Sequence, residues 1–223
     1  MILPPCDAEG FVLAGGKSSR MGKDKSLVRL ECRPLIQHAI QILRNAGLDA
    51  RIAGRRADLS EFAPVVLDQP EQVSLGPLAG ICSALSMAAS RFAVFLPVDV
   101  PLIPPSLIRY LIHHAALTAS ATSVVSVAAF IHTFPVVVDR AALPALQRNL
   151  ASGDRNCLKA FRSAALALRR PFSALPLELL VQPGLVRHSR GVTSSQWFLN
   201  INSPHDLTVA EDVLARSDAE SVK

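Results

Sequence analysis

The stretch LAGGKSSRMGKDK, Leu13 to Lys25, directly follows an apolar run that begins at Phe11. Two adjacent glycines, Gly15 and Gly16, allow the backbone to turn sharply and to approach a ligand closely, because they carry no Cβ. Free backbone N–H groups in such a turn form a concave anion site. The Lys and Arg residues that follow add positive charge. The stretch therefore predicts a phosphate-binding loop at the end of a first strand.

Two common phosphate-binding loops do not match. A P-loop has four residues between its first glycine and Gly-Lys-Ser/Thr. Here Gly16 and Gly22 enclose five residues, and Asp24 stands where Ser or Thr is required. The dinucleotide fingerprint GxGxxG is also absent. From residue chemistry alone, two interpretations of this stretch remain: a nucleotide site, or a strand-to-helix turn with basic surface residues.

The chain around this loop alternates between apolar runs of strand length and longer amphipathic segments, which predicts an α/β fold with a mostly parallel sheet. The run at 91–99 is continuously apolar, as in a strand buried on both faces. We expect a single domain over residues 1–223 with helices on both faces of the sheet, with 216–223 as a frayed tail and 171–196 as a loop with an extra strand. The expected strands are 11–14, 50–54, 63–68, 91–99, 122–130, 134–139 and 197–202, and the expected helices are 35–46, 78–90, 105–116, 141–150 and a last one that starts at 203–204.

Charge and composition narrow the classes of function. The net charge of +5 favours acidic partners such as phosphates or nucleic acid. Aromatic residues are only 5% of the chain and the basic residues form no long stripe, so we do not expect nucleic-acid binding. The chain contains no run of about 18 apolar residues, so we expect no membrane span. The cysteines are scattered without a CxxC pair, which favours reduced thiols and a cytoplasmic location.

Acidic and amide side chains follow several of the predicted strands. Asp99 ends the apolar run at 91–99, and a carboxylate at the end of a buried strand needs a partner. Mg²⁺ takes one or two carboxylates together with phosphates and water, so Asp99 is a candidate metal ligand. Asp68 ends a similar apolar run and is a candidate site residue, although an Asp that only stabilises a turn is an equally good interpretation. Asn200 and Asn202 are weaker candidates at the end of the last strand.

The stretch from Leu13 to Leu27 closely resembles the signature LAGGxSxRMGxDKxL of the molybdenum cofactor guanylyltransferase family, MobA. Further pieces resemble the same family in the same order. They are SLGPLAGICSAL at 74–85, FLPVDVPLIPPSLIRYL at 95–111 and FLNINSPHDL at 198–207, with weaker likeness at 134–139 and 153–161. The resemblance covers most of the chain and is weakest at 171–196.

The resemblance implies that residues 1–223 form a single MobA-like domain with the three-layer, Rossmann-like nucleotidyltransferase fold. The same resemblance implies a Mg²⁺-dependent enzyme that transfers GMP from GTP to Mo-molybdopterin and releases pyrophosphate. It also implies transient contacts with other proteins of molybdenum cofactor synthesis. By their matching positions, the implied catalytic residues are Arg20, Lys25 and Asp99, the implied metal ligand is Asp99, and the implied nucleotide-binding residues are Leu13, Ala14, Gly15, Gly16, Lys25, Asp68, Gly80 and Asp99.

One departure concerns base specificity. The family often has an Asn after the second strand, near the base, whereas this chain has Ala53-Gly54. A sister group uses CTP, but it usually shows LAAG in place of LAGG, so GTP is favoured here. A cytidylyltransferase, another MobA-like transferase and a nucleotide-binding scaffold without catalysis remain the alternatives.

Overall fold

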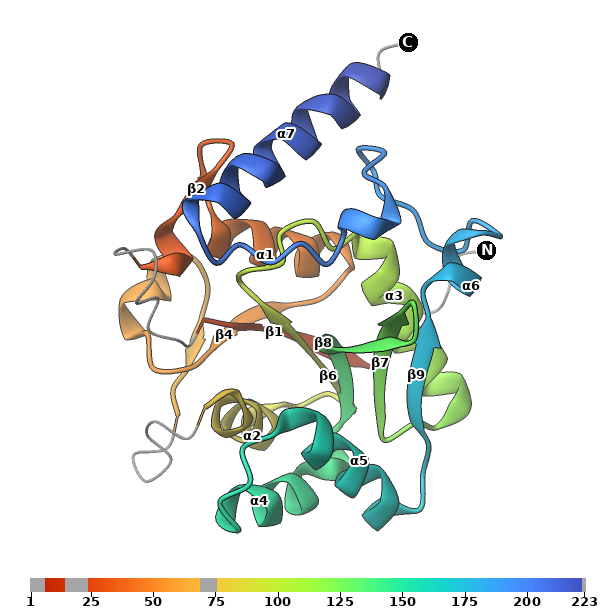
Figure 1. Cartoon of the computed structure of the whole chain (residues 1–223). Coiled ribbons are helices and arrows are strands. Elements are labelled where there is room, and N and C mark those ends of the chain that lie inside the picture. The colour runs from red at the N-terminus through yellow and green to blue at the C-terminus, as the bar shows by residue number, and fades with distance from the viewer. Residues whose placement is uncertain (1–6, 15–23, 69–75, 222–223) are drawn as a thin grey trace.

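The computed structural model describes residues 7–14, 24–68 and 76–221. Within these residues, seven strands form one sheet in the order β5-β4-β1-β6-β8-β7-β9 (Figure 1). β8 runs antiparallel to β6 and β7, and the other neighbouring pairs are parallel. The strands are β1 (Ala8–Leu13), β4 (Ala50–Ala53), β5 (Val65–Val66), β6 (Phe92–Pro97), β7 (Thr122–Val127), β8 (Phe130–Asp139) and β9 (Phe172–Pro176).

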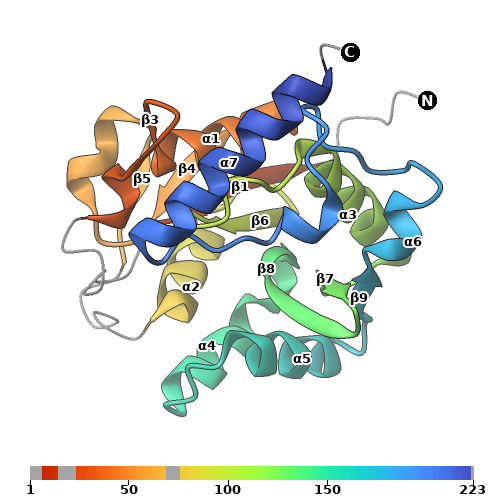
Figure 2. The ribbon, with the colours of Figure 1, turned by 45° about the horizontal axis from the view of Figure 1, so that its top comes forward.

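Helices cover both faces of the sheet, which gives the three layers that the sequence predicts (Figure 1). α1, α3 and α7 lie on one face, and α2, α4 and α5 lie on the other, as the tilted view in Figure 2 also shows. None of the described helices is both long and apolar enough to span a membrane. The helices are α1 (Leu35–Asn45), α2 (Pro77–Met87), α3 (Pro105–Thr118), α4 (Leu143–Ala151), α5 (Cys157–Leu168), α6 (Glu178–Val181) and α7 (Pro204–Ser221).

The central strand β6 explains why the run at 91–99 is apolar without alternation. Successive side chains of a strand point to opposite faces, and here both faces are covered by helices. Phe95 packs in the core beside α2, α4 and α5, and Leu96 packs in the core beside α1, α3 and α7. Phe95 also stacks on Phe11 of β1, with ring centroids 5.5 Å apart. The predicted buried strand is therefore confirmed.

The carboxyl ends of β1, β4 and β6 meet at one edge of the sheet. Ala14 N donates to Ala53 O at 3.4 Å, and Val98 N donates to Leu13 O at 3.4 Å. In an open α/β sheet, ligands bind at this edge. The residues that follow these strands, including Gly54 and Asp99, are therefore placed where a ligand site is expected.

The strand expected over 197–202 is wrong. The segment is irregular in the structure. Trp197 and Ile201 are buried in the core shared with α1, α3 and α7, and Phe198 and Leu199 pack against that core partly buried. Trp197 is 2% exposed, and its indole Nε1 donates to Val192 O at 2.8 Å. Ile201 N donates to Asp99 O at 2.9 Å, which ties the segment to the end of β6.

The tail expected to fray at 216–223 is helical as far as Ser221, the last described residue. Arg190 explains part of this order, because its guanidinium joins α7 to two other elements. It donates to Asp218 Oδ1 at 2.9 Å and to Glu31 Oε1 at 2.8 Å. Glu31 lies in the turn of a small hairpin, β2 (Arg29–Leu30) and β3 (Arg33–Pro34). The ambiguous 171–196 stretch contains β9, α6 and the short 3-10 helix η5 (Ser194–Gln196).

Candidate active site

Lys25 and Asp99 meet at the carboxyl edge of the sheet. Lys25 begins the 3-10 helix η1 (Lys25–Leu27), and its Nζ donates to Asp99 Oδ2 at 2.7 Å. The same Nζ donates to Asn202 Oδ1 at 2.6 Å. The side chains of Lys25 and Asp99 are 16% and 24% exposed, so the ion pair is partly shielded from water. The fold thus brings an ammonium, a carboxylate and an amide from three distant parts of the chain to one point.

Asn200 completes this cluster. With its amide nitrogen facing the carboxylate, Asn200 donates to Asp99 Oδ2 at 3.0 Å and to Oδ1 at 3.2 Å. Lys25, Asp99, Asn200 and Asn202 are four of the residues that the sequence nominates, and they contact one another here. We call this group the Lys25–Asp99 cluster.

The start of α7 holds Asn202 in place. Asp206 Oδ2 accepts hydrogen bonds from Asn202 N at 2.9 Å and from Ser203 N at 2.8 Å. Ser203 Oγ in turn accepts from Asp206 N at 3.3 Å, so Ser203 and Asp206 form a capping box. The bond from the Asn202 amide and those from Ser203 lower the pKa of Asp206. Asp206 therefore supports the start of α7.

A second group of nominated residues lies on the other side of β1. A Cβ built on Gly80 of α2 would lie 3.4 Å from Asp68 Oδ1 and 4.0 Å from Leu13 Cδ2, so these three residues are neighbours. Asp68 Oδ1 is buried and finds no hydrogen-bond partner among the described residues. Burial raises the pKa of the Asp68 carboxyl, while the positive charge of Arg55 opposes the shift. An acceptor oxygen is thus held beside a helix position that carries no side chain.

Arg56 is a residue that the sequence reasoning missed. Its guanidinium forms an ion pair with Asp24, the residue that caps η1 by accepting from Ser26 N at 3.0 Å. The hydrogen bond from Arg56 lowers the pKa of Asp24. Asp24 is therefore ionised and fixed immediately before Lys25. The short Asp-Lys-Ser capping pattern is readable in the sequence, whereas nothing local to Arg56 indicates its partner.

Three nominated residues, Gly15, Gly16 and Arg20, lie outside the described residues. The described neighbours of this loop are Ala14, which is 4% exposed at the end of β1, and Asp24 at the start of η1. Gly54 lies close to Ala14, because Ala14 N donates to O of Ala53, the residue before Gly54. Gly54 has φ 138° and its N donates to Val66 O at 3.1 Å. The departure at Ala53-Gly54 is thus located beside the predicted nucleotide site.

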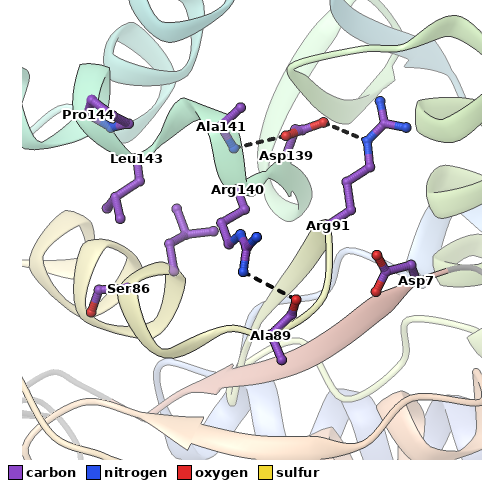
Figure 3. A pocket seen from close by; sticks show the side chains of 10 residues that line it. Asp7, Ser86, Ala89, Arg91, Asp139, Arg140, Ala141, Leu143 and Pro144 are labelled. Atoms are coloured by element: carbon purple, nitrogen blue, oxygen red, sulfur yellow. Dashed lines mark hydrogen bonds and ion pairs between the residues drawn. The ribbon is translucent and has the colours of Figure 1, made fainter.

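A hollow of about 560 Å³ lies at the opposite edge of the sheet and is shown in Figure 3. Arg91, Arg140 and Asp139, three of its charged groups, are engaged within the protein. Arg91 Nε donates to Asp139 Oδ2 at 3.0 Å, and Arg140 donates to the carbonyl oxygens of Ala88 and Ala89. Asp139 is 3% exposed and also pairs with Arg170 at 2.7 Å. We interpret this cluster as structural.

Comparisons with known proteins agree with the geometry at the carboxyl edge. The model of the MobA-like NTP transferase domain matches residues 10–167, which is more than half of the chain. The chain belongs to the MobA-like NTP transferase family. The match begins within β1, includes the residues after it, Gly80 and Asp99, and ends in α5. This chain is therefore a nucleotidyltransferase.

Curated relatives carry a more specific name. A molybdenum cofactor guanylyltransferase of Pseudomonas putida is 33% identical over 166 residues, which is 73% of this chain and 85% of the relative. One from Vibrio cholerae is 34% identical over 161 residues, 70% of this chain and 77% of the relative.

A solved structure supports the fold of this transferase. It is the molybdopterin-guanine dinucleotide biosynthesis protein A of Archaeoglobus fulgidus, with a TM-score of 0.74 and 21% identity. The superposition covers 93% of this chain and 99% of that protein. The predicted α/β nucleotidyltransferase fold is therefore confirmed.

Proposed function

We propose that this transferase joins GMP from GTP to the terminal phosphate of Mo-molybdopterin. A phosphate oxygen of the acceptor forms a bond to the α-phosphorus of GTP, and the bond from that phosphorus to the bridging oxygen of pyrophosphate breaks. The observation that carries the proposal is the Lys25–Asp99 cluster at the carboxyl edge, in a chain whose curated relatives are named guanylyltransferases. Both substrates are polyanions, which suits the net charge of +5.

The described residues divide into two groups with different tasks. Leu13, Ala14, Gly80 and Asp68 lie toward β4 and β5, where the buried oxygen of Asp68 can accept from N–H or O–H groups of a nucleoside. Lys25 lies toward β6 and offers an ammonium to the phosphates. Positioning and charge stabilisation do most of the work in phosphoryl transfer. By the signature, Arg20 adds positive charge at the leaving pyrophosphate, and Gly15 and Gly16 supply backbone N–H groups.

The residues present fit a Mg²⁺ ion that is held largely by substrate. The described residues contain no group of three or more His, Cys, Asp and Glu that could hold a metal ion without other ligands. Asp99 offers one carboxylate where the phosphates are expected, and Mg²⁺ commonly binds through one or two carboxylates with phosphates and water. Asp99 would hold the ion, with the amide oxygen of Asn202 nearby on Lys25. When bound, Mg²⁺ would neutralise charge on the triphosphate.

Reduced cysteines support a cytoplasmic location for the reaction. Cys82 and Cys157 are free and buried, and burial raises the pKa of the Cys82 thiol to about 12 and that of Cys157 to about 11. Such thiols stay protonated and unreactive at neutral pH. The acceptor would be received from, and the product passed to, other proteins of cofactor synthesis through transient contacts.

Calorimetry with Mg²⁺ present tests the proposal, with GTP, CTP and ATP titrated into wild type and Asp99→Asn. We expect GTP to bind tightest and to bind more weakly to the variant, and Mg²⁺-dependent pyrophosphate release with Mo-molybdopterin to be lost in the variant. Asp58→Asn is a matched control, because this carboxylate is 61% exposed and lies outside the cluster.

A preference for CTP would assign the protein to the sister group and connect Gly54 with base choice. If none of the three nucleotides bound, the scaffold reading would replace catalysis.

A further inference from the structure

Three aromatic rings from two distant parts of the chain form a row. Phe130 meets His132 edge-on, with ring centroids 5.2 Å apart and 80° between the planes. His132 stacks on Phe198, with centroids 4.0 Å apart and 29° between the planes. Both arrangements fall within the geometries preferred by aromatic pairs, or close to them. We call these three residues the ring row.

The register of the sheet places the ring row at the carboxyl edge. Val94 of β6, Val137 of β8 and Ser123 of β7 are paired side by side. β7 continues for four residues beyond Ser123 to Val127, which pairs with Phe130. Phe130 therefore lies about as far along the sheet as residue 98, which immediately precedes the carboxylate of the Lys25–Asp99 cluster.

Phe198 links the ring row to that cluster through the backbone. It is two residues before Asn200, whose amide contacts Asp99. Two peptide units span at most about 7 Å, so the Cα atoms of Phe198 and Asn200 lie within that distance. Ile201 N bonds to Asp99 O at 2.9 Å, which fixes the segment against β6.

Phe130 is presented to solvent on a well-anchored turn. The residue is 69% exposed, and the turn before it contains Ala128 and Ala129 with φ of 47° and 66°. Two left-handed residues define the tight hairpin turn that matches strand twist. Glu178 of α6 accepts from Ala128 N at 2.8 Å and holds the tip. A large apolar ring is thus kept in water by ordered structure, as in a binding surface.

The order of the strands separates the ring row from the nucleoside side. The Asp68–Gly80 pair lies by β5, β4 and β1, and Asp99 follows β6. Phe130 and His132 of the ring row lie on β8, the next strand on the far side. Neighbouring strands are about 4.8 Å apart. A nucleotide with its base toward β4 and its phosphates at Asp99 leaves the β8 side for the second substrate.

We propose that the ring row is the platform on which the fused-ring end of the acceptor stacks. The occupant is a planar pterin-type heterocycle whose phosphate reaches the Lys25–Asp99 cluster, and this rests on the proposed function. His132 suits a neutral platform, because burial lowers the pKa of its imidazole and disfavours the charged form. Aromatic side chains bind planar heterocycles by stacking in the same way when they bind nucleic-acid bases.

Trp197 supplies a direct readout. It is the single Trp of the chain, it is buried, and it immediately precedes Phe198. A pterin absorbs in the near ultraviolet, where Trp emits, so a pterin bound on the ring row should quench this fluorescence. The probe is 6-hydroxymethylpterin, titrated in the presence of a non-hydrolysable GTP analogue and Mg²⁺.

We expect Phe130→Ala to weaken pterin binding about 5- to 150-fold, from the usual size of a base–aromatic stack. Phe130→Tyr keeps the ring and should stay within about twofold of wild type. Leu166→Ala is the matched control, since Leu166 is 82% exposed on α5 and distant in the fold. In transfer assays, Phe130→Ala should raise the KM for the acceptor and keep the KM for GTP.

Pterin binding by Phe130→Ala that equals wild type, or no pterin binding by wild type, would overturn the platform. If wild type binds pterin through Phe130 but transfers no guanylyl group, the platform stands and the proposed function is lost. If transfer occurs with an unchanged acceptor KM in Phe130→Ala, the proposed function stands and the platform is lost.

Discussion

Gly80 lies inside α2, where glycine is less favourable than alanine by up to about 1 kcal/mol. The space around it is sufficient for a methyl group, because a Cβ would meet Asp68 Oδ1 at 3.4 Å and Leu13 Cδ2 at 4.0 Å, both ordinary contacts. Gly80→Ala should therefore raise the free energy of unfolding by about 0.5–1 kcal/mol. In a chain of this size the melting temperature should rise by about 2–4 °C per kcal/mol.

The same methyl should weaken GTP binding, because it fills space beside the acceptor oxygen of Asp68. Overpacking a fitted site costs about 1–3 kcal/mol, which corresponds to a Kd about 5- to 150-fold higher. Thermal melts without ligand and calorimetry with Mg²⁺ and GTP measure the two effects separately on one variant.

Gly47→Ala is the control, because it should change stability without changing GTP binding. Gly47 follows α1 with φ +89° and no atom within 4 Å of an added Cβ, so the substitution strains only the backbone. It should lower stability by about 1 kcal/mol and leave the Kd for GTP unchanged. Wild-type GTP affinity in Gly80→Ala would refute the placement of the nucleotide, and a fall in its melting temperature would refute the packing argument.

Two further predictions concern charged groups. Arg56→Ala should raise the pKa of Asp24 toward its ordinary value. It should also raise the KM for nucleotide, because Asp24 would no longer be fixed as the N-cap of η1 before Lys25. The free energy of unfolding should fall by about 1 kcal/mol or less. Asp58→Asn removes the other carboxylate on Arg56 and should leave kinetics unchanged, and equal kinetics for both variants would contradict a positioning role. Burial opposes ionisation of Asp139, but Arg170, the Ala141 amide and Arg91 outweigh it and lower its pKa. Its contribution to stability is therefore present above the unfolded pKa of about 4 and is lost as pH falls through the lower folded value. In guanidinium unfolding at pH 7, Asp139→Asn should be about 2 kcal/mol less stable than wild type, and the difference should shrink as the pH falls to 3. A difference that stays constant with pH would show that it does not come from ionised Asp139.

The path of the chain explains why some local predictions were wrong. The apolar residues of Trp197–Asn202 are typical of a strand, but the segment bonds to Asp99 and Val192 instead of to a neighbouring strand. The polar tail from 216 looks too hydrophilic to be ordered, yet Arg190 bonds to Asp218 and extends α7. In both places the deciding contact comes from a residue that is distant in sequence.

The sequence by itself determined the layered α/β fold, the family and the edge of the sheet where the site lies. Apolar periodicity reports local burial, and a long mixed signature around Lys25 is specific enough to identify a loop. Only the tertiary structure showed that Lys25 meets Asn202, 177 residues away, that Arg56 fixes Asp24, and that Phe130 lines up with Phe198. These contacts depend on how strands are ordered and how loops cross the sheet edge, and residue patterns within one segment carry no information on either.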